Sequence, residues 1–541
     1  MKKKILVTCA FPYANGDLHI GHMLEHIQAD IWVRYKKMKK YEIWFICSDD
    51  AHGTPIMLKS DSLNLSPEKY ISYIYKNHVR DLKNFNINYD NYYSTHSLEN
   101  LFFLKKIYSS LKKQGLIIKK DIFQLFDDFK KIFLPDRYVK GSCPICYKHD
   151  QYGDHCEVCG ASYSAVDLLN PVSILSGYTP ILKKSLHFFF NLPYFKDFLK
   201  SWISSDVFQG SVMNKLSEWL KLGLKEWDIS RDSPYFGFNI PEFLDKYFYV
   251  WLDAPIGYIS TFKNLCNKNH DINFFDFWNK DSNCELYHFI GKDIIYFHSF
   301  FWPSILEAIN FRKPTKIFVH GHVTMNGLKL SKSKGTLVLA KKWLKYLDSD
   351  SLRYYYASKL SSKVQDIEIN FDHFVGKVNS DIVNKIVNLA SRVSYFINFR
   401  FGSMLSSRID NLMLYDKFIN SSIYIENMFE RCEFNLVVIK VISLADLANS
   451  YIDDKKPWEL AKHVKYDIIL HDVCTMAINL FRILATWLKP IVPDLVEKVE
   501  EFLNITLLWE DISSPLLNHN ISMFKNLRNR IDLNNCLKIL V

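Results

Sequence analysis

The sequence predicts an α/β protein built on a doubly wound parallel sheet, with a cysteine-rich insertion and an all-helical region after the sheet. Short apolar runs of strand length alternate with amphipathic helical segments over residues 1–115 and again from residue 231. Between these stretches the chain is turn-rich and holds two closely spaced cysteine pairs. From about Phe371 to the end the pattern is almost wholly helical.

Composition places the chain among globular proteins of several domains. It has 541 residues, of which 48% are hydrophobic and 23% charged. The net charge of +10 favours a polyanionic partner. The 40 Phe and 31 Tyr accompany many Ile, Lys and Asn residues, which indicates compositional drift, so scattered basic and aromatic residues are not taken as binding evidence.

No membrane segment or disulfide framework is expected. Residues 1–10 faintly imitate a signal peptide, but the apolar run is short and leads directly into turn residues. The most apolar stretch, residues 474–488, is broken by Asn479 and Arg482. Of the 11 cysteines, four form a compact pattern and the others are scattered. We therefore expect a cytoplasmic protein with a metal site and no membrane partner.

The first unit of the sheet is a strand, a tight loop and a helix. Residues 5–10 are apolar and β-prone, and Pro12, Asn15 and Gly16 then break the pattern. From Leu18 to about Met38 the apolar residues recur with a helical period. This order is typical of the first βα unit of an open α/β sheet.

Histidines lie beside the apolar face of this helix. His19, His22 and His26 are three and four residues apart, and the first two fall in the first helical turn. Free backbone N–H groups at that position favour an anion, and Gly21 leaves room for a flat ring. The pattern favours a nucleotide triphosphate site. A solvated histidine face is the ordinary alternative, and residues 22–26 also match the inverted zinc-peptidase pattern H-x-x-E-H.

Two cysteine pairs predict a zinc site. Cys143 and Cys146 form one C-x-x-C pair, and Cys156 and Cys159 form the other. Four thiolates can surround one zinc ion tetrahedrally, and a site with four protein ligands leaves no open position for catalysis. Scattered buried cysteines are the alternative reading. A zinc knuckle can also bind nucleic acid.

Further strands are predicted where apolar runs end in polar residues. Residues 43–47 lead to Asp49 and Asp50, which lie at the ligand-binding end of the sheet unless they only cap the next helix. Residues 247–258 are expected to form a strand running into a functional loop. Residues 286–290 and 316–320 complete the sheet, and the first of these leads into a helix with Ile294, His298 and Trp302 on one face. A core aromatic stripe is the default for such a face.

A lysine-rich loop follows the last strand. Residues 326–336 combine Gly, small hydroxyl residues and three alternating lysines, a composition suited to phosphates. A solvated lysine run is the ordinary explanation.

Together these segments resemble the class I methionyl-tRNA synthetases over essentially all 541 residues. The letters HIGH occur at residues 19–22, and Lys329-Leu330-Ser331-Lys332-Ser333 resembles the KMSKS loop, with Leu330 in place of Met. Either motif alone is weak, since HIGH-type signatures also occur in nucleotidylyltransferases. The two motifs occur here in the expected order, together with Asp50, segment 251–258, the cysteine knuckle and the helical tail. This combination is specific to the family. The pattern is that of the bacterial type with one four-cysteine knuckle and no C-terminal tRNA-binding appendage.

The resemblance implies a methionine–tRNA ligase that forms methionyl-adenylate from methionine and ATP and then charges the 3′ end of tRNA(Met). It assigns catalysis to His19, His22 and Lys332. Mg²⁺ would accompany ATP, and the zinc would be structural. The implied ATP-binding residues are His19, Gly21, His22, Lys329, Ser331, Lys332 and Ser333.

For methionine the resemblance implies a cavity of aromatic walls and weak donors, which suits a thioether. Asp50 would bind the ammonium group, and Phe11 stands where Leu is common in relatives. The implied methionine-binding residues are Phe11, Tyr13, Asp50, Trp251, Ala254, Pro255, Tyr258, Ile294, His298 and Trp302.

For tRNA the resemblance implies that Asn388, Arg392 and Trp458 read the CAU anticodon. The alternative is an ordinary helical bundle with solvated rim residues. Because the chain ends soon after residues 529–532, we expect a monomer. The rival function is a non-catalytic, zinc-containing RNA-binding protein derived from a synthetase, which would lack the ATP residues.

The predicted divisions follow from these segments. They are a Rossmann-type catalytic domain in two parts, a connective insertion with the zinc knuckle, a KMSKS-like loop with a stem-contact region, and an α-helical anticodon-binding domain. The catalytic domain comprises residues 1–115 and 231–325, and the connective insertion comprises residues 116–230. The KMSKS-like loop with the stem-contact region comprises residues 326–387, and the anticodon-binding domain comprises residues 388–541.

Overall fold

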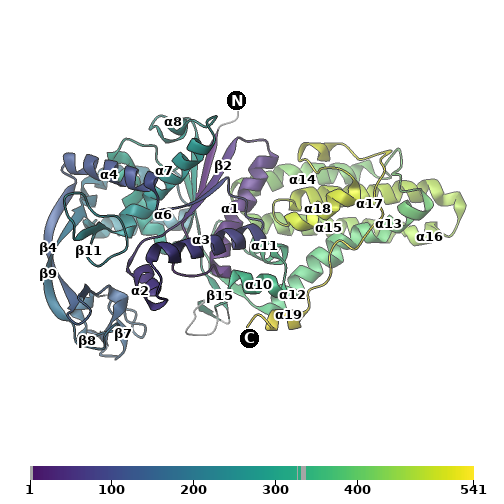
Figure 1. The fold of residues 1–541 in the computed structure, drawn as a ribbon. Helices are drawn as coiled ribbons and strands as arrows, with labels where there is room; N and C mark the ends of the chain where they lie inside the picture. Colours follow the sequence, from purple (N-terminus) through teal and green to yellow (C-terminus); the bar gives the residue numbers. More distant parts are fainter. Residues whose placement is uncertain (1–3, 162, 326, 330–336, 541) are drawn as a thin grey trace.

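A computed structural model of the chain describes residues 4–161, 163–325, 327–329 and 337–540. Its centre is a five-stranded parallel sheet in the order β14–β13–β1–β2–β3, seen in Figure 1 in the left half of the molecule. The predicted strands near residues 5, 43, 286 and 316 are confirmed. The strands are β1 (Ile5–Cys9), β2 (Ile43–Asp49), β3 (Asn91–Ser94), β13 (Glu285–Gly291) and β14 (Lys316–His320).

Helices cover both faces of this sheet. Along β1, Ile5 and Val7 pack into the core formed with α1 (Ile20–Met38), whereas Leu6 packs into the core formed with α7 (Val250–Lys268). This alternation is expected of a strand buried on both faces. The other helices of this part are α2 (Thr54–Ser62), α3 (Pro67–Asn84), α4 (Leu98–Lys113), α8 (Phe274–Trp278) and α9 (Trp302–Ala308).

The segment predicted as a strand and loop at residues 247–258 is mostly helical, so that prediction is wrong. Strand β12 (Lys246–Phe248) is short, and α7 begins at Val250 and contains Pro255 and Gly257. An apolar run without a clear period does not distinguish a buried helix from a strand, and Pro255 argued against a helix at the sequence level.

The insertion has two small sheets. Strands β4 (Ile117–Asp127) and β9 (Ile181–Phe190) form a long antiparallel pair, flanked by β5 (Ile132–Phe133) and β10 (Trp227–Asp228). The cysteine pairs lie by the second sheet, made of β6 (Val139–Ser142), β7 (Gln151–Tyr152) and β8 (Leu169–Ser173). Helices α5 (Lys196–Ile203) and α6 (Gly210–Leu222) follow, and β11 (Ser230–Asp232) pairs with β12.

A connecting region joins the sheet to the helical part. Strand β15 (Val323–Met325) pairs with β16 (Leu328–Lys329) and with β17 (Ile367–Ile369). Helices α10 (Ala340–Tyr346) and α11 (Ser349–Ala357) lie between β16 and β17 in the sequence and pack against α1.

The C-terminal part is a helical bundle, seen in the right half of Figure 1. α12 (Phe371–Val378), a π-helical stretch (Asn379–Val387) and α13 (Asn388–Arg400) form one helical run, so the predicted division at residue 388 lies inside it. The other helices are α14 (Leu412–Glu430), α15 (Phe434–Lys455), α16 (Pro457–Leu460), α17 (Asp467–Leu488), α18 (Pro493–Leu503) and α19 (Leu533–Leu537).

The prediction of helix to the end is wrong for residues 514–532, which hold no helix and run back toward the sheet. The side chain of Arg528 pairs with Asp348, and the amide of Asn379 donates to the carbonyl of Ile531. The path of this segment is fixed by these contacts with distant residues and not by a helical period of its apolar residues.

Two helical stretches are long and apolar enough to span a membrane by length and composition. They are Phe434–Leu460 and Val464–Leu488, and 50% and 83% of their most apolar windows are buried inside the protein. Helices α15 and α17 pack against each other and against α13 within the bundle. Their apolar faces therefore form the core of this bundle.

Candidate active site

His19 and His22 cap the N-terminus of α1. His19 is the N-cap residue, and its Nδ1 accepts a hydrogen bond of 3.1 Å from the N–H of Gly21. The N–H of His19 in turn donates to Nδ1 of His22 at 3.2 Å. The two rings stack with their centroids 3.7 Å apart. Because both Nδ1 atoms accept, a neutral ring of either histidine carries its proton on Nε2 and presents it as a donor.

Electrostatics favour an anion in front of these rings. Burial, together with the neighbouring His19 and His26, lowers the pKa of His22 well below its ordinary value. His22 is therefore a neutral donor at pH 7. The dipole of α1 adds positive potential at the same point.

Helix α3 supports the loop that leads into α1. The hydroxyl of Tyr70 donates to the carbonyl of Asn15, and Nε2 of His78 bonds the carbonyl of Gly16, each at 2.8 Å. Nδ1 of His78 lies 2.7 Å from Asp49, at the end of β2. This network fixes the loop between β1 and α1 against the ends of the neighbouring strands.

A cavity of about 380 Å³ opens in front of the α1 N-terminus. It lies at the carboxyl ends of β1, β13 and β14, where open α/β sheets bind ligands. Three polar residues of its lining, Glu25, His320 and His322, were not predicted from the sequence as residues of this site. The lining residues are Ala10, Phe11, Pro12, His19, Gly21, His22, Glu25, His26, Gly291, Asp293, His320, Gly321, His322 and Val323.

A second cavity of about 170 Å³ adjoins the first and shares Ala10 and Phe11 with it. It is mostly aromatic and apolar, and the start of α7 forms one wall. The lining residues are Ala10, Phe11, Asp50, Val250, Trp251, Ala254, Pro255, Tyr258, Ile294, Phe297 and His298. All of these except Ala10, Val250 and Phe297 are among the residues implied to bind methionine.

Two of the implied methionine residues do not line this cavity. Tyr13 forms a backbone bridge with Asp50, and its hydroxyl lies against Gly53, where a Cβ would approach to 2.5 Å. Trp302 is fully buried, and its indole N–H donates to Nε2 of His288 at 3.1 Å. A π-helical turn at Phe297–Phe301 precedes Trp302, whose ring centroid lies 5.9 Å from that of the cavity residue Tyr258.

Asp50 presents an unpaired buried oxygen to the second cavity. Within the described part of the chain, its Oδ1 has no hydrogen-bond partner. Burial and the nearby Asp253 raise the pKa of Asp50 well above its ordinary value. A carboxylate in such surroundings is stabilised by a cation that arrives with a ligand.

Tyr258 and His298 form a polar pair in the same cavity. The hydroxyl of Tyr258 lies 2.9 Å from Nε2 of His298, and Nδ1 of His298 lies 3.1 Å from the carbonyl of Ile294. Burial lowers the pKa of His298 to about 4, so the ring is neutral at pH 7. Its Nδ1–H then donates to the carbonyl, and Nε2 accepts from Tyr258.

The inverted zinc-peptidase reading of residues 22–26 is wrong. Nδ1 of His26 bonds the hydroxyl of Tyr89 at 2.6 Å, and Glu25 faces His320 at 3.3 Å. Among the described residues, the one group arranged to hold a metal ion is the set of four cysteines.

The described residues that flank the lysine-rich loop lie beside the first cavity, with Val323 of β15 before the loop and Leu339 after it. Lys329 lies in β16, while Ser331, Lys332 and Ser333 lie outside the described residues. After the loop, the carbonyl of Val338 accepts a hydrogen bond of 3.0 Å from the N–H of Ile20, and Leu339 bridges to His19. The chain on the far side of the loop is therefore bonded to the α1 N-terminus.

The four cysteines have the geometry of a tetrahedral thiolate site. Their sulfur atoms all lie within 4.8 Å of one another. The Sγ–Sγ distance is 3.8 Å for Cys143 and Cys159 and 3.5 Å for Cys146 and Cys156. Zinc–sulfur bonds of about 2.3 Å in a tetrahedron give about 3.8 Å. Backbone N–H groups of Cys146 and Cys159 also point at the sulfurs of Cys143 and Cys156.

The residues implied to read an anticodon lie together at the far end of the bundle. Asn388 and Arg392 are on α13, and Trp458 is on α16. The guanidinium carbon of Arg392 lies 5.0 Å from the centroid of the Trp458 ring, and Arg392 also pairs with Asp453. Trp458 is 40% exposed.

Comparison with known proteins decides the family. The family model described as tRNA synthetases class I (M) matches residues 5–394. The chain belongs to this family. It is an aminoacyl-tRNA ligase.

Relatives and solved structures agree with this assignment. A methionine–tRNA ligase of Buchnera aphidicola subsp. Baizongia pistaciae is 73% identical, with 98% of each chain covered. A methionine–tRNA ligase of the subspecies Acyrthosiphon pisum is 59% identical over 98% of this chain and 97% of that relative. The fold matches Mycobacterium tuberculosis methionyl-tRNA synthetase in complex with methionyl-adenylate, with a TM-score of 0.81, 21% identity, and 97% and 99% coverage.

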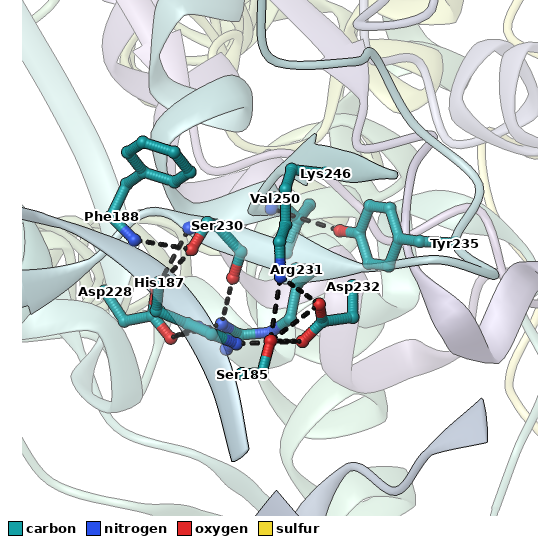
Figure 2. A network of polar contacts seen from close by, with 10 residues as sticks. All are labelled: Ser185, His187, Phe188, Asp228, Ser230, Arg231, Asp232, Tyr235, Lys246 and Val250. Carbon is teal, nitrogen blue, oxygen red and sulfur yellow. Dashed lines mark hydrogen bonds and ion pairs between the residues drawn. The ribbon is translucent and has the colours of Figure 1, made fainter. Parts of the chain in front are cut away.

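In this synthetase a buried charged cluster supports the start of α7. His187 lies between two carboxylates, with Nδ1 2.8 Å from Asp228 and Nε2 3.0 Å from Asp232 (Figure 2). Lys246 bonds Asp232, and Arg231 bonds Asp228 at 2.8 Å.

The cluster reaches the second cavity through α7. The guanidinium carbon of Arg231 lies 3.5 Å from the centroid of the Tyr249 ring. The N–H of Val250, a residue of the cavity wall, donates to the hydroxyl of Tyr235 at 3.2 Å (Figure 2). Val250 follows Tyr249 directly, so the cluster fixes the first turn of α7.

His187→Gln is expected to destabilise the synthetase in a pH-dependent way. Burial alone would lower the pKa of His187, but its hydrogen bonds to Asp228 and Asp232 outweigh burial and raise it. The stability from the charged ring is therefore complete below pH of about 6.5 and is lost as pH rises through the raised value. Urea unfolding should show a loss of about 1–3 kcal/mol at pH 6 that shrinks by pH 9.

The exposed His270→Gln serves as the control and should leave stability unchanged at both pH values. A loss for His187→Gln that is equal at pH 6 and pH 9, or larger at pH 9, would show that the ring is not held as a cation.

Proposed function

We propose that this synthetase activates methionine with ATP and transfers the methionyl group to the 3′ end of tRNA(Met), both initiator and elongator, as a monomer in the cytoplasm. The observation that carries the proposal is the pair of adjoining cavities. One lies at the N-terminus of a buried helix, and the other is an aromatic cavity with a single unpaired carboxylate oxygen. The two cavities share Ala10 and Phe11, which supports binding of the two ligands side by side.

ATP occupies the first cavity. The Nε2–H groups of His19 and His22 donate to phosphate oxygens, and Gly21 leaves room for the adenine ring. Lys332 neutralises the leaving pyrophosphate, together with Lys329, Ser331 and Ser333, because both flanks of their loop lie beside this cavity. Mg²⁺ bound with ATP supplies further charge neutralisation at the phosphates.

Methionine occupies the second cavity. Asp50 pairs with the ammonium group, and the aromatic walls, including the ring of Tyr258, contact the thioether. The carboxylate oxygen attacks the α-phosphorus of ATP, the bond from that phosphorus to the bridging oxygen breaks, and pyrophosphate leaves with the bond electrons. No covalent nucleophile of the protein is required, so positioning and charge neutralisation supply the catalysis.

The remaining sites serve tRNA and the fold. Asn388, Arg392 and Trp458 bind the anticodon by hydrogen bonding and stacking. Cys143, Cys146, Cys156 and Cys159 hold one zinc ion, which has no open position and so stabilises the insertion without taking part in catalysis.

The amino-acid dependence of ATP–pyrophosphate exchange tests the function. Exchange is expected with methionine alone among the twenty amino acids. Asp50→Asn should raise the KM for methionine about 10- to 100-fold, since it removes a charged partner of the ammonium group, with little change in the KM for ATP. Asp128→Asn, at an exposed carboxylate of the insertion, is the matched control and should behave as the wild type.

Exchange with a different amino acid would contradict the assignment of the second cavity. No exchange with any amino acid would favour a non-catalytic RNA-binding protein.

Metal analysis tests the zinc site. One zinc per chain is expected in the wild type and in Cys284→Ser, a buried cysteine outside the cluster. Cys143→Ser should lose most of the metal, because three thiolates bind zinc far more weakly than four. A wild-type protein without zinc, or equal zinc content after Cys143→Ser, would refute the site.

A further inference from the structure

One face of α13 carries more than the two residues assigned to the anticodon. Asn388, Arg392, Tyr395 and Phe399 are spaced by four, three and four residues, so they form a single stripe along the helix. The opposite face of α13 is the packed one, since Leu389, Val393 and Ile397 are fully buried in the bundle. We call Tyr395 and Phe399 the aromatic pair.

Both rings of the aromatic pair are exposed, and they contact each other. Tyr395 is 65% exposed and Phe399 is 66% exposed. Their ring centroids lie 4.9 Å apart with an angle of 40° between the ring planes. The two rings therefore form one continuous apolar surface, although the packing of α13 requires neither of them.

The pair continues the surface on which Arg392 and Trp458 lie. Arg392 contacts the Trp458 ring at one end of α16, and the guanidinium of Arg400 donates to the carbonyl of Ala461 just after α16. Helix α16 is thus held along α13 over the same length that the aromatic pair occupies. Arg392 to Phe399 spans about 10 Å along the helix axis, which matches about three stacked nucleotides.

The chemistry of this surface fits single-stranded RNA better than another protein. Aromatic faces stack any base, and the exposed Lys456 just before α16 supplies positive charge for phosphates, whereas Arg392, Arg400 and Lys455 pair with Asp453, Asp467 and Asp410. Among the described residues, Phe102 at 59% and the contacting rings of Phe129 and Tyr178 are also exposed, but none of these three lies on α13 or α16. Exposure alone therefore does not single out Tyr395 and Phe399, whereas their position does.

We propose that Tyr395 and Phe399 form a second stacking platform, which binds nucleotides of the tRNA anticodon loop that adjoin the anticodon. This inference rests on the proposed function, because it extends the site at Asn388, Arg392 and Trp458. Through this platform, the identity of the nucleotides that flank the anticodon, and how well they stack, affect which tRNA is selected.

Aminoacylation kinetics with the full chain test the platform. The double variant Tyr395→Ala with Phe399→Ala should lower kcat/KM for tRNA about 5- to 100-fold, mainly through KM. Methionine-dependent pyrophosphate exchange, which needs no tRNA, should be unchanged. Replacing both residues with Leu keeps apolar bulk without a π face and should show the same loss, whereas Tyr395→Phe should retain wild-type values.

Trp458→Ala and Phe102→Ala complete the design. Phe102→Ala, at an exposed aromatic on α4, should leave tRNA kinetics unchanged. If Trp458→Ala weakens tRNA use but both double variants stay within twofold of the wild type, the platform is refuted and the anticodon site stands. If Trp458→Ala has no effect, the anticodon site itself fails. A loss in the double Ala variant that the double Leu variant does not share would show an apolar contact with no stacking, which also overturns the proposal.

Discussion

A fully buried cation, Arg353, joins parts of this molecule that lie far apart in the sequence. Arg353 of α11 is fully buried, and its guanidinium donates to Asp30 of α1 at 2.7 Å and to the carbonyls of Phe85, Pro490 and Ile491. It thereby ties α1 and the end of α3 to the turn between α17 and α18. Tyr356 of the same helix donates to the carbonyl of Ile20, beside the HIGH histidines. A buried cation with four of its five N–H donors paired tolerates little movement, because an uncompensated charge costs about 3–5 kcal/mol.

The site depends on this rigidity, because the proposed reaction is carried by positioning. The donors of His19 and His22 are set by bonds within the first turn of α1, and α3 fixes the loop before it. Among the described residues, Asp49 and Asp50 each keep one unpaired buried oxygen, but Asp50 lines the second cavity, whereas Oδ1 of Asp49 bonds His78 and Tyr92. Adjacent carboxylates thus have different tasks, one holding the fold and the other facing the ligand cavity. The proposed anticodon surface lies on the far side of the bundle that Arg353 attaches to α1 (Figure 1).

Local patterns predicted the parts of the fold that are set by local chemistry. Ile5–Cys9 and Ile43–Asp49 are apolar runs that end in turn or acidic residues, and both are strands. The spacing of the two cysteine pairs predicted that their four sulfur atoms lie close together. The failed prediction of helix to the end depended on tertiary contacts, because residues 514–532 follow partners on distant elements. Val250 and Phe297 have no polar signature, so only the structure shows them in the cavity wall.

The central claim is that one continuous site holds ATP and methionine, with Ala10 and Phe11 where the two cavities meet. The most direct test is inhibition of pyrophosphate exchange by a non-hydrolysable analogue of methionyl-adenylate. Such a molecule fills both cavities at once, so inhibition should be competitive with ATP and also with methionine. Competition with only one of the two substrates would contradict a single continuous site.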